Sequence, residues 1–559
     1  MNNALNNLKA RETDDRTRQA ILPKRIIKTY GNIANTEILL NGTEPQIFLW
    51  DDVSCIFENN DHDPNSAVII DFGKEIHGTI KLYVSKINDR DSHAEFKIRF
   101  GESVMEALTP LGQKSTTIDH STRDLTMKVG WLSANETNET GFRFVYIELL
   151  SPKTKVEVNM IEAILIYRDI EYLGSFDCDN RLLCDIYDTG AYTTHINMQT
   201  YLWEGIKRDR LVWIGDMNIE VLTILSVFGN HGIISKSLDL IKDKTPVGKW
   251  MNTMSTYTLW WINIQYNLYM WSGDICYLKE QQKYLRDLSE LLCTYVDENG
   301  KENLPRNRFF DHTANKNTDA VHAAVQSLMC IAIGRACFLL NELGENETAD
   351  ICKRTHSLLK GYTPDYGGSK PAAAMLVCSE IADAKKMCKD IIIPGSPKGF
   401  TIFTGYQCLE SMAMAEEFEI AMNCICKYWG GMIKMGATTF WEDFNVEWME
   451  NAAPIDEIVP ESRKDIHGDF GDYCYKNFRH SLCHGCASAP TPWLAKYVLG
   501  INILKPGCRE IRILPHLGNL KFAKGTFPTP YGTISVSHKK VNGKVITEYT
   551  APKEINVIL

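Results

Sequence analysis

A dense cluster of charged and aromatic side chains occurs in the segment WEGIKRDRLVWIGD, residues 203–216. It places Asp209 among three cations, with two more acids and two tryptophans close by: Lys207, Arg208, Arg210, Glu204, Asp216, Trp203 and Trp213. Charge alone favours a solvated loop, in which each ion pair contributes about 0–1 kcal/mol. The large apolar neighbours favour a different interpretation, because they would partly desolvate the cluster and prepare a carboxyl group for acid–base chemistry.

A second carboxyl group with an aromatic neighbour lies in GATTFWEDF, residues 436–444, where Glu442 follows Trp441. Cleavage of a glycosidic bond needs two carboxyl groups flanking that bond, and aromatic side chains suit the apolar face of a sugar. Asp209 and Glu442 are therefore a candidate acid–base pair. From the sequence alone, a packed surface loop explains Glu442 equally well.

Several other polar and aromatic residues are weaker candidates, because each one alone is typical of a structural role. They are Asp311 and His312 in FFDHT, His484 in SLCHG, and the adjacent Trp260 and Trp261. Cys483 and Cys486 have the C-x-x-C spacing of some zinc sites, but no second cysteine pair stands at zinc-finger spacing. We therefore expect packed thiols there, with no metal and no cofactor.

The elements that must position these residues change type twice along the chain. Residues 1–25 are polar and predict a loose arm, and residues 26–170 contain short alternating segments that predict a β-sandwich. From 171 to 503, apolar residues recur at three- and four-residue steps, which predicts about ten or more helices in a closed barrel of hairpins. Strand patterns return in residues 504–559, with an Asn-Gly hairpin turn at 542–543.

The composition is that of a globular protein of several domains, with 559 residues of which 44% are hydrophobic and 23% charged. A net charge of −10 argues against nucleic acid as a partner. The N-terminal segment has no apolar signal-peptide core, and no run approaches the roughly 18 apolar residues of a membrane helix. The 17 cysteines are scattered through apolar segments, which suits a reducing compartment. We therefore expect a cytoplasmic protein with no membrane partner.

The segment KRDRLVWIGD resembles the signature R-D-[ED]-R-L-G-W-x-G-D of bacterial α-L-rhamnosidases, glycoside hydrolase family 78. Other segments resemble the family in matching order: DFGKEIHGTIKLYV, IRFGESVMEAL, TYTLWWINIQYNLYMWSGD, ATTFWEDF, SLCHG and PGCREIRILPHLGNL. The resemblance covers about residues 66–559. It implies a central all-α (α/α)6 barrel flanked by an N-terminal β-sandwich and a small C-terminal β domain. It also implies hydrolysis of terminal α-L-rhamnosides with inversion at the anomeric carbon.

The resemblance further implies roles for individual residues, with Asp209 on the general-acid position and Glu442 on the general-base position. The residues implied to bind the sugar are Glu204, Lys207, Arg208, Trp213, Asp216, Trp260, Trp261, Asp311, His312, Trp441 and His484. An acid must hold its proton, and nearby cations oppose this. We therefore expect the arginines to point away from Asp209 or to pair with the other acids.

Three features depart from the family pattern. Lys207 stands where an arginine is common, Glu204 is offset by one from the usual acid, and Asp311-His312 replaces a common Asp-Trp pair. Two alternatives therefore remain, an inverting glycosidase for another sugar and a catalytically inactive sugar-binding protein. Replacing Asp209 with Asn separates them, because only an enzyme has hydrolysis to lose. The expected partner is a small rhamnoside or oligosaccharide, and a homodimer is left open.

Overall fold

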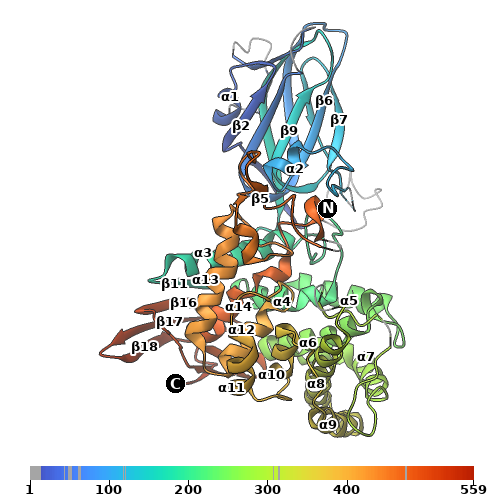
Figure 1. The fold of residues 1–559 in the computed structure, drawn as a ribbon, viewed down its shortest axis with the longest axis vertical. Helices are drawn as coiled ribbons and strands as arrows, with labels where there is room; N and C mark the ends of the chain where they lie inside the picture. The colour runs from blue at the N-terminus through green and yellow to red at the C-terminus, as the bar shows by residue number, and fades with distance from the viewer. Residues whose placement is uncertain are drawn as a thin grey trace, which may run out of the picture.

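The computed structural model describes residues 14–42, 45–47, 53–60, 65–117, 119, 121–305, 307–311, 315–472 and 475–559. In these residues a sheet domain stands at one end of a helical domain, and a smaller sheet lies on the side of the helical domain (Figure 1). The predicted order of an N-terminal β-sandwich, a central helical barrel and a C-terminal β domain is confirmed.

The N-terminal domain is a ten-stranded sheet in the order β3-β4-β10-β5-β9-β6-β7, with β1 paired to β10 and both β2 and β8 paired to β5. Its β-branched and aromatic residues alternate between a buried core and the outside, as a half-buried strand requires. The elements are β1 (Thr17–Ile21), β2 (Arg25–Tyr30), β3 (Asn32–Ala34), α1 (Ile38–Asn41), β4 (Cys55–Glu58), β5 (Ala67–Ile87), β6 (Ala94–Gly101), α2 (Val104–Leu108), β7 (Asp124–Val129), β8 (Ser133–Glu136), β9 (Thr140–Leu149) and β10 (Lys155–Tyr167).

Strand β1 corrects the expectation of a loose arm up to residue 25. Thr17 pairs with Tyr167 and Ile21 pairs with Ala163, so this segment is an antiparallel partner of β10. Its residues are mostly polar and exposed, and the backbone pairing holds them in the sheet. Residues 1–13 lie outside the described part of the chain.

The helical domain is a ring of six helices surrounded by others. Helix α4 packs on α6, α6 on α8, α8 on α10, α10 on α12, α12 on α14, and α14 on α4, which closes the ring. The ring helices are buried on nearly all sides; in α4 every residue except Leu222 is buried. The helices are α3 (Arg181–Asn197), α4 (Ile214–Val227), α5 (Gly232–Lys244), α6 (Ser255–Ser272), α7 (Ile275–Cys293), α8 (Thr318–Glu342), α9 (Asn346–Gly361), α10 (Lys370–Cys378), α11 (Ala384–Met387), α12 (Gly405–Met414), α13 (Phe418–Lys434) and α14 (Pro490–Trp493).

Among the described helices, α8 is long and apolar enough to cross a membrane by length and composition. In this fold 72% of its most apolar stretch is buried inside the protein. It packs on α6, α9 and α10, so its apolar surface is that of a core helix of the ring.

The C-terminal β domain consists of two small sheets, in the orders β11-β16-β17-β18 and β14-β15-β19. Its first strand, β11 (Ser175–Cys178), precedes the helical ring in the sequence and pairs with β16. The predicted hairpin turn is confirmed, because Val541 pairs with Lys544 and both Asn542 and Gly543 have positive φ. The other strands are β14 (Ile501–Lys505), β15 (Glu510–Ile513), β16 (Phe522–Thr529), β17 (Gly532–Val541), β18 (Lys544–Thr550) and β19 (Asn556–Ile558).

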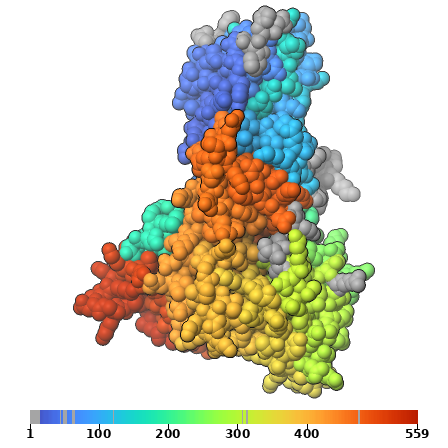
Figure 2. Space-filling view, viewed as in Figure 1, coloured from blue at the N-terminus to red at the C-terminus, as the bar shows by residue number. Residues whose placement is uncertain are grey.

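Two long connections carry the candidate site. Residues 198–213 join α3 to α4, and residues 435–489 join α13 to α14 with only short elements, including β12 (Ala452–Ala453) and β13 (Lys464–Asp465). The longer connection fills the space between the sheet domain and the helical ring, where it is orange in Figure 2. It is fixed to the sheet domain by a hydrogen bond from Arg143 to the carbonyl of Gly436 (2.9 Å).

Candidate active site

The two connections enclose a cavity of about 260 Å³ at the end of the ring that faces the sheet domain. We call it the acidic pocket, and its lining is Glu204, Arg208, Asp209, Trp213, Asp216, Met254, Tyr257, Phe309, Glu442, Tyr475, Arg479 and His484. Seven of these residues were singled out in the sequence, and they come from segments more than two hundred positions apart. The volume suits one small ligand, since it lies below the roughly 300–1,000 Å³ of sites for drug-sized molecules.

Asp209 lies in a strained turn. Asp209 and Arg210 both have left-handed backbone conformations, with φ of 56° and 54°. The Glu204 carboxylate holds this turn, because it accepts hydrogen bonds from the backbone N–H groups of Arg210 (3.1 Å) and Leu211 (3.0 Å). Strained residues that the surroundings hold in place are frequent at functional sites.

Arg208 connects the two candidate catalytic carboxyl groups. Its guanidinium donates to Asp209 Oδ2 (2.7 Å) and to both carboxylate oxygens of Glu442 (2.5 and 2.6 Å). The expectation for the arginines is that they point away from Asp209 or pair with the other acids; Arg208 does pair with another acid, Glu442, but it also binds Asp209. Arg208 stands at the second position of the motif, where the pattern reads aspartate.

Glu442 and His484 are brought to this pocket by backbone contacts of the longer connection. The N–H of Ser481 donates to Glu442 Oε2 (3.0 Å), and the N–H of Gly485 donates to the carbonyl of Glu204 (2.8 Å). A Cβ atom at Gly485 would lie 1.6 Å from Glu220 Oε1, so a larger residue there would have to displace the buried Glu220 side chain. These contacts align the two connections side by side.

His484 and Glu204 have altered proton affinities. Burial disfavours the charged form of His484, but the hydrogen bond to Asp216 (3.1 Å) and the negative charge of Glu442 outweigh it and raise the pKa of His484. Burial, together with repulsion from Asp209 and Asp216, holds the pKa of Glu204 well above its ordinary value. The pocket therefore contains a carboxyl group that favours its protonated form.

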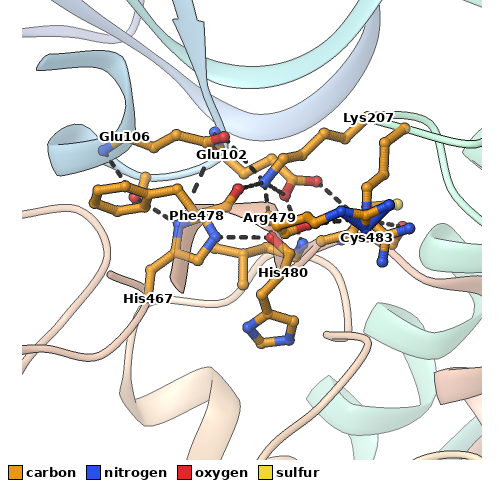
Figure 3. Close-up of polar contacts among 12 residues, drawn as sticks. Glu102, Glu106, Lys207, His467, Phe478, Arg479, His480 and Cys483 are labelled. Carbon is orange, nitrogen blue, oxygen red and sulfur yellow. Dashed lines mark hydrogen bonds and ion pairs between the residues drawn. The ribbon is translucent and has the colours of Figure 1, made fainter. Parts of the chain in front are cut away.

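Lys207 does not line the acidic pocket, so the structure offers no support for its predicted contact with the sugar. Its ammonium group lies 3.2 Å from Glu102 and 2.9 Å from Glu106 of the sheet domain, as Figure 3 shows. It also donates to the carbonyls of Phe478 and His480, at 2.7 Å each. The turn at 209–210 directs Arg208 into the pocket and leaves its neighbour directed away from it.

Four other predicted sugar contacts are core residues outside the acidic pocket. Trp261 and Trp441 are fully buried, Trp260 packs edge-on against Phe403, and the buried Asp311 accepts a hydrogen bond from Thr404 (3.0 Å). His312 lies outside the described residues.

The aromatic walls come instead from Tyr257, Phe309 and Tyr475. Tyr257 lies one helical turn before the two tryptophans and belongs to the same aromatic run of the sequence.

Two groups of buried residues in the described part of the chain could hold a metal ion. One is Asp216, His484 and Cys486, whose ligand atoms lie within 4.8 Å of one another, and the other is Glu102, Glu106 and His467. The C-x-x-C pair itself forms no such group, because Cys483 belongs to neither. Within the first group, His484 and Asp216 already bind each other.

A closed ring of helices between two β domains, with several carboxyl groups at one end, defines the class of six-hairpin glycosidases. Three family descriptions match the chain in order: the glycosyl hydrolase family 78 alpha-rhamnosidase N-terminal domain at 51–165, the bacterial alpha-L-rhamnosidase 6 hairpin glycosidase domain at 171–347, and the bacterial alpha-L-rhamnosidase C-terminal domain at 500–559. The chain belongs to glycoside hydrolase family 78. Glu442 and His484 lie between the second and third matched segments, so these matches do not include them.

The individual proteins that are similar to this chain are also named as rhamnosidases. The chain is 23% identical over 466 residues to an alpha-L-rhamnosidase of Alteromonas sp. (strain LOR), covering 74% of this chain and 48% of that protein. The GH78 rhamnosidase of Bacillus sp. GL1 superposes with a TM-score of 0.72 at 19% identity, over 89% of this chain and 53% of the other. A rhamnosidase from Klebsiella oxytoca with rhamnose bound superposes with a TM-score of 0.67 at 19% identity, over 86% of this chain and 96% of the other. The chain thus spans about half the length of the curated relative.

Proposed function

We propose that the acidic pocket hydrolyses terminal α-L-rhamnosides with inversion of configuration. The observation that carries this proposal is that Asp209 and Glu442, from two distant connections, face one small cavity and bind the same guanidinium. The family of the chain and the rhamnose-bound relatives support rhamnose as the sugar. A small terminal rhamnoside is the substrate class that a cavity of about 260 Å³ suits.

In this mechanism Glu442 is the general base. Every hydrogen bond described for its carboxylate is donated to it, by Arg208 and by the N–H of Ser481, so its orientation is fixed while a lone pair can take a proton from water. An inverting enzyme keeps its two carboxyl groups roughly 6.5–9.5 Å apart to leave room for that water. Arg208 acts as a spacer between them and holds both.

Asp209 is the general acid of the proposal, and Glu204 is the competing candidate. Asp209 occupies the acid position of the motif, and its carboxyl group accepts a hydrogen bond from Arg208. Glu204 lines the same pocket, and burial and the neighbouring acids raise its pKa. The indole N–H of Trp213 has no acceptor among the described residues, so it is a donor for a sugar hydroxyl group.

Kinetics on a panel of aryl glycosides, beginning with p-nitrophenyl α-L-rhamnoside, test the proposal. Glu442→Gln is expected to lower kcat by about 10²–10⁴-fold. Asp209→Asn should lose more activity on an alkyl rhamnoside than on the p-nitrophenyl substrate, because a poor leaving group needs the acid more. If Glu204→Gln shows this leaving-group dependence and Asp209→Asn does not, Glu204 is the acid.

The exposed Glu298 provides a matched control, and Glu298→Gln should keep full activity. If the protein hydrolyses a different glycoside of the panel and not the rhamnoside, the proposed substrate changes to a glycoside of that sugar. Rhamnose binding without any hydrolysis would identify a sugar-binding protein instead.

We also propose a cytoplasmic location, in a reducing compartment. The sixteen cysteines in the described residues are all free thiols, and most are buried in the core.

A further inference from the structure

A second and larger cavity, of about 530 Å³, lies inside the helical ring. We call it the inner chamber. Side chains of α4, α6, α8, α10 and α12 line it, and strands β14 and β16 of the C-terminal domain close it. It shares no lining residue with the acidic pocket. Met414 and Leu514 line it and are 37% and 46% exposed, so the chamber opens to solvent.

Several polar atoms around the chamber have no partner among the described residues. They are Asn218 Oδ1, both amide atoms of Asn263, Gln407 Oε1 and Glu410 Oε2. Asn263 is fully buried, and Asn218 and Gln407 are 5% and 7% exposed. A buried polar group without a partner costs about 1–3 kcal/mol, so a bound molecule that supplies hydroxyl groups would recover this free energy.

The chamber also contains a cationic side chain, Arg335, that is not paired with a carboxylate of the described residues. Arg335 forms no ion pair with any described residue; its guanidinium lies 4.8 Å from the centre of the Tyr266 ring. Glu410 is the one carboxylate among the described lining residues, and both Lys496 and Tyr497 (2.7 Å) already donate to it. Burial lowers the pKa of Arg335, which reflects the cost of a charge kept away from water. The chamber is therefore prepared for an anion.

We propose that the inner chamber binds a small hydroxylated carboxylate, of the chemical class of a sugar acid. The planar fork of Arg335 matches a carboxylate in two parallel hydrogen bonds. The amides of Asn218, Asn263 and Gln407 donate to and accept from hydroxyl groups. The rings of Trp260 and Tyr266 offer apolar faces to the C–H groups of such a ligand. The volume lies within the usual range for small-molecule sites.

Titration calorimetry with D-glucuronate and D-galacturonate tests this proposal, with D-glucose and D-galactose as the matched neutral sugars. We expect one uronate site on each chain of the wild-type protein. Arg335→Gln should weaken uronate binding by about 10- to 100-fold, because it removes a charge-assisted pair. The matched control is Arg354→Gln on α9, an exposed arginine, and it should bind as the wild type does. Asp209→Asn should also bind normally, since the two cavities share no residue.

Three results would overturn the proposal. One is a folded wild-type protein that binds no uronate, in which case water satisfies the unpartnered atoms. Another is uronate binding that survives Arg335→Gln but is lost in Asp209→Asn. The third is equal affinity for a uronate and for its neutral analogue, which would show that the charge of Arg335 does not contribute to binding.

If Arg335→Gln does not fold, Met414→Trp at the exposed opening replaces it. Because Met414 lines the chamber, the larger indole should occupy part of the ligand's space and weaken uronate binding by about tenfold. Unchanged binding would count against the chamber.

Discussion

At the scale of single residues, His484 links two acids of the acidic pocket. Its Nε2 lies 3.1 Å from Asp216 Oδ1, and its Nδ1 lies 4.0 Å from Glu442 Oε1. The imidazole is therefore held between a hydrogen-bonded carboxylate and a second negative charge. Its protonation state decides whether it donates one or two hydrogen bonds to this pocket.

Replacing Asp216 with Asn should lower the pKa of His484. Burial disfavours the imidazolium, and the hydrogen bond to Asp216 is the main contact that opposes burial. NMR titration of the histidine ring protons measures this change. His516, which lies outside the pocket, provides an internal control and should titrate as in the wild type. An unchanged pKa of His484 would mean that Asp216 does not set its charge.

The residue types of the pocket could be predicted, but the directions of the side chains could not. Asp209, Glu442 and His484 could be identified as candidates, because the motifs that contain them are visible in the sequence itself. Lys207 and Arg208 are both cations that precede Asp209 in the sequence, but only Arg208 lines the acidic pocket. The backbone direction here includes the left-handed turn at 209–210. That turn is fixed by contacts with Glu204, which no local pattern reveals.

At the scale of elements, Lys207 anchors the 198–213 connection to the sheet domain. It is 6% exposed and pairs with two acids of the α2 region, Glu102 and Glu106, which are themselves buried (Figure 3). The positive charge of Lys207 therefore has a structural role, which is to pair with these two acids. The ion pairs of this buried cluster fix where the 198–213 connection meets the sheet domain.

Lys207→Met should destabilise the protein by about 3–5 kcal/mol, because it leaves buried acids without their cation. Unfolding in urea measures this difference. Lys249→Met is the matched control: this lysine is exposed, and its replacement should change stability by no more than about 0.5 kcal/mol. Equal stabilities of the two variants would show that the cluster does not need its charge.

The helices of the ring could be predicted from their long apolar segments, because burial on all sides requires apolar residues throughout. Strand β1 could not be predicted, since its residues are mostly exposed and its partner β10 lies far along the chain. The same limit applies to the long 435–489 connection, which has few regular elements and is shaped by contacts with two domains.

At the scale of the whole molecule, the interface between the sheet domain and the ring should make stability depend on pH. Burial raises the pKa of Glu102 to about 7, although Lys207 opposes this. A carboxyl group whose pKa is higher in the folded state stabilises the protein below its unfolded value of roughly 4.5, and this contribution is lost as pH rises towards 7.

The wild-type protein should therefore lose stability between about pH 5 and pH 8, and Glu102→Gln should lose less, by on the order of 2 kcal/mol. Denaturant unfolding across this pH range measures the difference. Glu298→Gln changes an exposed acid in the same way and should follow the wild type at every pH. A Glu102→Gln curve parallel to the wild type would contradict the assignment.

Proton NMR of the first sugar released from an α-L-rhamnoside examines both the reaction and its stereochemistry at once. Because the proposed reaction at Asp209 and Glu442, which bind one guanidinium, proceeds with inversion, we predict β-L-rhamnose as the first product, followed by slow mutarotation. Initial release of the α-anomer would contradict the inverting geometry. Intact substrate in the presence of folded protein would contradict rhamnoside hydrolysis itself.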